Sequence, residues 1–99
     1  MAINREKINK NAEKYIKAGR LENAIAEYLT LLKDNPKDWQ VRNQVGDLYA
    51  RLGKVRESVH HWTEMAEFYT QDGFILKAIA MYTKVKRIDP QNLGVMTTP

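Results

Sequence analysis

The sequence predicts an all-α protein, an antiparallel stack of helix–turn–helix repeats (an α-solenoid) with about five helices. Residues of the same kind recur 34 positions apart, and a second set recurs 54 positions apart. Within each unit the apolar residues lie three or four positions apart, which places them on one face of a helix. A recurring period of this length is typical of helical repeat proteins.

The matched residues are aromatic, small, aliphatic, glycine or proline. The 34-residue spacing pairs Tyr15 with Tyr49, Gly19 with Gly53, Leu21 with Val55, Ala24 with Ser58, Tyr28 with Trp62 and Leu31 with Met65. The 54-residue spacing pairs Ile8 with Trp62, Ala12 with Ala66, Tyr15 with Tyr69, Gly19 with Gly73, Leu21 with Ile75, Ala24 and Ile25 with Ala78 and Ile79, Tyr28 with Tyr82, Leu31 with Val85 and Pro36 with Pro90. Two such registers in one short chain indicate repetition rather than chance.

The predicted helices are 5–18, 21–34, 39–52, 55–71 and 74–88. Gly19 separates the first two helices at a point where a helix end favours positive φ. Pro36 ends the second helix, because the residue before a proline is pushed out of the α region. Asp38 is the expected N-cap of the third helix. The fourth helix is expected to serve two overlapping units, because Trp62 is matched at both spacings.

We expect residues 1–90 to form a single domain and residues 91–99 to be a disordered tail. The fifth helix carries more apolar residues than a one-sided stripe needs. Repeat stacks usually end in a helix with a polar outer face, and the sequence shows none. The chain therefore either self-associates through this helix or resembles a piece of a longer repeat protein. The self-association candidates are Phe74, Ile75, Met81, Val85 and Ile88.

The pattern of small and large residues resembles the tetratricopeptide repeat family over about residues 5–92. Small residues stand where that family needs close helix approach, at Ala12, Gly46, Ala66, Ala24, Ser58 and Ala78. Large residues fill the spaces between them, at Tyr15, Tyr28, Tyr49, Trp62, Tyr69 and Tyr82. The resemblance implies a stack whose first-type helices line a concave groove for a peptide or helix.

Composition and motifs give no support to an enzyme, and we expect no cofactor, metal or small-molecule substrate. The chain has no cysteine, which fits a cytoplasmic protein. No apolar run approaches the length that spans a membrane. The adjacent His60 and His61 point about 100° apart on a helix, so ordinary helix-surface contacts are favoured over a metal site. Nucleic-acid binding is a minor alternative, because acidic residues interrupt the basic stripe of the first helix.

The resemblance implies groove positions on the first, third and fifth helices. They are Glu6, Asn9, Glu13, Lys17, Gln40, Asn43, Asp47, Arg51, Lys77 and Lys84. The family members that clamp acidic chaperone tails use lysine, asparagine and arginine at the corresponding positions, which read here Asn9, Glu13, Gln44, His60 and Glu64, so the basic clamp residues are missing. We therefore expect a protein-interaction module, an adaptor or scaffold, that binds a polar or basic peptide or helix. The alternative is structural self-assembly into a homodimer or helix-exchanged oligomer through the fifth helix.

Overall fold

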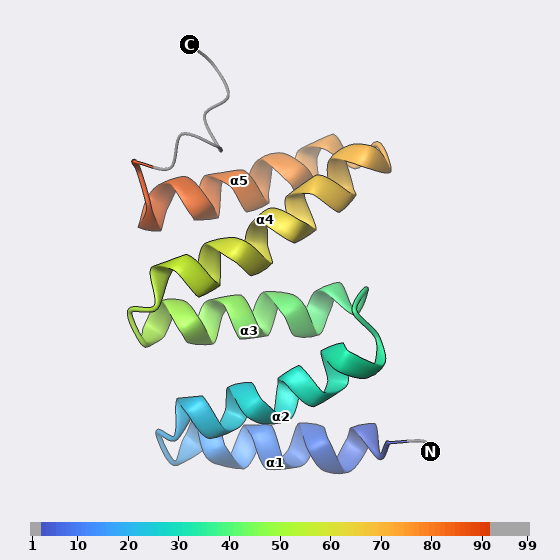
Figure 1. The fold of residues 1–99 in the computed structure, drawn as a ribbon, viewed down its shortest axis with the longest axis vertical. Helices are drawn as coiled ribbons and strands as arrows, with labels where there is room; N and C mark the ends of the chain where they lie inside the picture. Colours follow the sequence, from blue (N-terminus) through green and yellow to red (C-terminus); the bar gives the residue numbers. More distant parts are fainter. Residues whose placement is uncertain (1–2, 92–99) are drawn as a thin grey trace.

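In the computed structural model, which describes residues 3–91, five helices follow one another along the long axis of the molecule (Figure 1). They are α1 (Arg5–Lys17), α2 (Leu21–Asp34), α3 (Trp39–Arg51), α4 (Val55–Gln71) and α5 (Ile75–Ile88). The predicted all-α fold and its five helices are confirmed, and every predicted helix end lies within one residue of the observed end. Of the predicted tail, only Gln91 falls inside the described residues.

The helix ends form as local chemistry dictates. Gly19, Gly53 and Gly73 adopt φ values of 75°, 77° and 83° in the turns after α1, α3 and α4. Positive φ is strained for residues that carry a Cβ, so these turns select glycine. The side chain of Asp38 accepts a hydrogen bond from the backbone N–H of Val41 at 3.2 Å, which confirms the predicted N-cap of α3.

The apolar stripes pack into two clusters. The first joins α1, α2 and α3 around residues that are fully buried, such as Leu31 and Val45. The second joins α4 and α5 around Trp62 and Val85. Buried Ser58 fastens α4 to α3, because its hydroxyl donates to the backbone carbonyl of Gly46 at 2.8 Å.

Helix α4 contacts α5 about as extensively as it contacts α3, whereas the contact between α2 and α3 is less extensive. The chain therefore contains two overlapping hairpins, α3–α4 and α4–α5, which share α4. The two spacings predict this sharing, because the segment around Trp62 matches both the first and the second helix of a unit.

The structure corrects part of the predicted self-association set. Met81 and Val85 are 7% and 0% exposed and belong to the chain's own core, so neither is available to a second copy. Ile88 is also partly buried against that core. The face of α5 directed toward α4 carries these residues, while Phe74 and Ile75 stay half exposed.

Candidate partner-binding surface

Helices α1, α3 and α5 run in the same direction, and α2 and α4 return between them (Figure 1). We call the predicted set of ten polar residues on these three helices the groove face. Of these, Asn9, Asn43 and Lys84 are half-buried. The other seven, Glu6, Glu13, Lys17, Gln40, Asp47, Arg51 and Lys77, are exposed.

Lys84 brings part of the groove face together. Its Nζ atom donates to Oδ1 of Asn43 at 2.9 Å and to Oδ1 of Asp47 at 2.8 Å. The same ammonium lies 4.4 Å from the ring centroid of Trp62, where the face of the indole attracts a cation. Residues 37 and 41 positions apart in sequence thus meet across α3 and α5, and the lysine offsets the charge of Asp47.

Two residues that correspond to Trp62 and Asp47 lie near each other between α1 and α3. Buried Tyr28 of α2 corresponds to Trp62 at the 34-residue spacing, as Glu13 corresponds to Asp47. Burial and then the carboxylate of Glu13 raise the pKa of the Tyr28 hydroxyl, while a hydrogen bond with Gln44 opposes that rise. Glu13 of α1 and Gln44 of α3 therefore both lie near the same hydroxyl group.

An ion pair joins the starts of α1 and α3. The guanidinium of Arg5 binds the carboxylate of Asp38, the residue that caps α3. Because both side chains are only partly exposed, the pair is better shielded from solvent than an ordinary surface ion pair. It fixes the register of the two helices at one end of the groove face.

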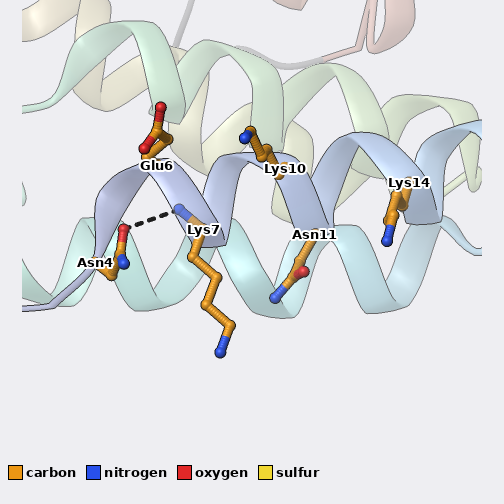
Figure 2. A pocket seen from close by; sticks show the side chains of 6 residues that line it. All are labelled: Asn4, Glu6, Lys7, Lys10, Asn11 and Lys14. Carbon is orange, nitrogen blue, oxygen red and sulfur yellow. Dashed lines mark hydrogen bonds between the residues drawn. The ribbon is translucent and has the colours of Figure 1, made fainter.

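Lys77 and Glu6 of the groove face have other surroundings. Nζ of Lys77 lies 5.6 Å from the ring centroid of Tyr69 and 5.3 Å from that of Phe74, near the α4–α5 turn. Glu6 lines a shallow hollow along α1, together with Asn4, Lys7, Lys10, Asn11 and Lys14 (Figure 2). The side chain of Glu6 points to the opposite side of α1 from that of Lys7 (Figure 2). Its negative charge on the helix that carries the basic stripe opposes the binding of a phosphate backbone.

A second cluster, formed by Arg42 and His61, is not predictable from the sequence. Nη1 of Arg42 lies 3.1 Å from Nδ1 of His61, and Nη2 donates to the carbonyl of Pro36 at 3.0 Å. The ring of His61 stacks on that of Tyr49 at 5.8 Å. Arginine carries donors only, so Nδ1 of His61 is the acceptor and Nε2 holds the proton. No spacing in the sequence connects Arg42 with His61, which are joined only by the packing of α3 on α4.

This environment keeps His61 neutral. Burial first, then the charges of Arg42 and His60, lower its pKa from 6.5 to about 4. The unfolded chain therefore binds a proton more readily than the folded chain. The contribution of His61 is fully present above pH 6.5 and is lost as the pH falls from 6.5 toward 4.

We expect the free energy of unfolding to fall by about 1 kcal/mol between pH 7 and pH 5 because of His61, after allowance for the screening of a partly exposed ring. Urea unfolding at the two pH values measures the loss. His61→Gln, which offers an amide oxygen to Arg42 and does not titrate, is the control that should lack this component. An equal pH dependence in both proteins would contradict the assignment.

Residues 12–53 match a family model described as TPR repeat. The match runs from the middle of α1 through α2 and α3 to the turn at Gly53, and so includes both halves of the Glu13–Tyr28–Gln44 arrangement. No curated protein sequence matches the chain. Within residues 3–91, no helix is both long enough and apolar enough to cross a membrane.

Proposed function

The chain belongs to the tetratricopeptide repeat family, whose repeats generally mediate protein–protein interaction, and we propose from this premise that it is a non-catalytic module that binds a peptide or helix on the groove face. The observation that carries the proposal is the contact of Lys84 with Asn43 and Asp47, which unites polar side chains of two helices into one prepared surface.

The network prepares Asn43 to recognise a peptide backbone. Its Oδ1 atom is occupied by Lys84, so the amide nitrogen keeps its two N–H donors for a backbone carbonyl of the ligand. Asn9, at the corresponding position of α1, is half-buried in the same way. Side chains held in place before binding lose little entropy when the ligand arrives.

The two ends of the groove face differ in charge. Lys84 offsets Asp47 at the α3–α5 end, whereas Glu13 adds a carboxylate beside the Tyr28 hydroxyl at the α1–α3 end. A ligand with a basic residue opposite α1 and a polar segment opposite α3 complements this distribution. Charge complementarity of this kind favours the correct orientation of the ligand.

We expect Asn43→Ala to weaken the binding of a selected peptide about tenfold, since one hydrogen bond to a desolvated partner is worth about 1–1.5 kcal/mol. Peptides selected from a displayed library are titrated by fluorescence anisotropy. Asp47→Ala should weaken binding similarly, because Lys84 loses one of the two acceptors that hold its ammonium group beside Asn43. The matched control is Asn23→Ala, which alters an exposed asparagine of α2. Unchanged affinity in both Asn43→Ala and Asp47→Ala would show that the peptide does not bind on the groove face.

A further inference from the structure

The outer face of α5 is the most apolar exposed surface of the described chain. Ile75, Leu76 and Ile79 are 52%, 84% and 54% exposed, and Phe74 in the preceding turn is 49% exposed. Phe74, Ile75 and Leu76 also line a shallow hollow at the start of the helix. Isolated exposed apolar residues are ordinary, but contiguous ones mark an interaction site.

An internal comparison shows what kind of surface this is. Ile79 corresponds to Ile25 of α2 at the 54-residue spacing, and Ile25 is only 4% exposed. Ile25 is buried in a cluster that includes Val41 and Val45 of α3, the helix packed on α2. The exposed face of α5 is therefore the equivalent of a face that another helix covers in the first unit.

The same comparison restricts the occupant of that face. Ile75 and Ile79 keep the apolar character of Leu21 and Ile25, but Thr83 and Lys86 replace Leu29 and Leu32. On the outer face of α5 only the first half is apolar, and the second half ends in the exposed basic pair Lys86 and Arg87. A covering helix must therefore be apolar opposite Ile79 and polar or acidic opposite Lys86.

We propose that the occupant is α5 of a second copy, packed antiparallel across a two-fold axis near Ile79. In that arrangement Leu76 of each copy lies against Ala80 and Thr83 of the other. The basic end of each α5 then approaches the other copy's α4–α5 turn, which carries the exposed acid Asp72. An isologous pair needs a face that complements itself, and a face with an apolar centre, one acidic end and one basic end does so.

Head-to-tail stacking fits the surfaces poorly. It would place the apolar face of α5 against the side of α1 that faces away from the other helices, which carries Lys7 and Lys14 (Figure 2). Burying these ammonium groups against isoleucine and leucine costs free energy without supplying partners. The symmetric pair avoids this and closes as a dimer instead of growing into a filament.

The first test is sedimentation equilibrium of the full chain. A single helix pair is smaller than a standard stable interface, so we expect a dimer with a dissociation constant of roughly 10–100 µM. Ile79→Glu should raise that constant at least tenfold, because two carboxylates would meet at the axis. The matched control Leu29→Glu places the same charge on an exposed leucine of α2 and should leave it unchanged. A monomer throughout the concentration range, or a dimer insensitive to Ile79→Glu, would overturn the proposal.

The second test examines the register. Asp72→Arg and Arg87→Asp should each weaken the dimer about threefold, and the double variant should restore it, because the two charges face each other across the interface. The chain contains no cysteine, so Ile79→Cys introduces a single thiol. Under oxidising conditions it should form a covalent dimer, while Leu29→Cys should not. A head-to-tail stack would instead be weakened by Lys7→Glu, and it would not be restored by the charge exchange between positions 72 and 87. That pair of results would contradict the symmetric dimer.

Discussion

Replacing Trp62 by alanine is expected to lower the free energy of unfolding by about 3–5 kcal/mol, the usual range for removal of a buried tryptophan. The side chain is 3% exposed and lies at the centre of the α4–α5 cluster. One edge of its ring abuts Gly46 of α3, and Lys84 of α5 lies over its face. The substitution therefore leaves a cavity where three helices meet.

Thermal unfolding followed by circular dichroism should show the transition of Trp62→Ala lowered by at least about 12 °C, given the size of the chain. Glu67→Ala, an exposed change on the same helix, is the matched control and should alter stability by less than about 0.5 kcal/mol. Trp62→Phe should cost much less than Trp62→Ala, because the indole N–H is buried without a hydrogen-bond partner. A loss below about 1 kcal/mol for Trp62→Ala would show that the cluster does not depend on this ring.

The helices could be predicted from the sequence because their determinants are local. Gly19 acts on its own backbone and Pro36 on the residue before it. Apolar residues three or four apart define a helix face without knowledge of its neighbours. The membership of α4 in two hairpins could also be predicted, since Trp62 is matched at two spacings. Each of these signals lies within a single helix or recurs at a fixed distance along the chain.

The contacts of the candidate site were beyond the sequence because they depend on how neighbouring helices pack. The lysine at position 84 could be placed on the groove face, but not opposite Asn43, which lies 41 residues away. The apolar breadth of α5 was visible, yet nothing in the sequence showed which residues α4 covers. Met81 and Val85 were therefore grouped with Ile75, although they point into the chain's own core.

Gly46→Ala is expected to destabilise the protein by about 1–3 kcal/mol, although the same change inside a helix ordinarily stabilises by about 1 kcal/mol. A Cβ atom at position 46 would overlap Nε1 of Trp62 and lie 2.7 Å from its Cδ1. The indole cannot retreat easily, because it is buried against α5 and held below Lys84. Steric overlap therefore outweighs the gain in helix propensity, and urea unfolding should show a lower midpoint.

The first repeat unit suggests the compensating change. It carries Ala12 and Tyr28 at the positions of Gly46 and Trp62. Alanine, which is larger than glycine, is thus paired with tyrosine, which has a smaller ring system than tryptophan. Adding Trp62→Tyr to Gly46→Ala should recover more than about 1 kcal/mol relative to the sum of the two single changes, as expected for residues in contact. Strict additivity in this double-mutant cycle would mean that the glycine is not required by the tryptophan. Recovery would show that the two units solve the same packing problem with different pairs of residues, and that Trp62 fits beneath Lys84 because position 46 carries no side chain.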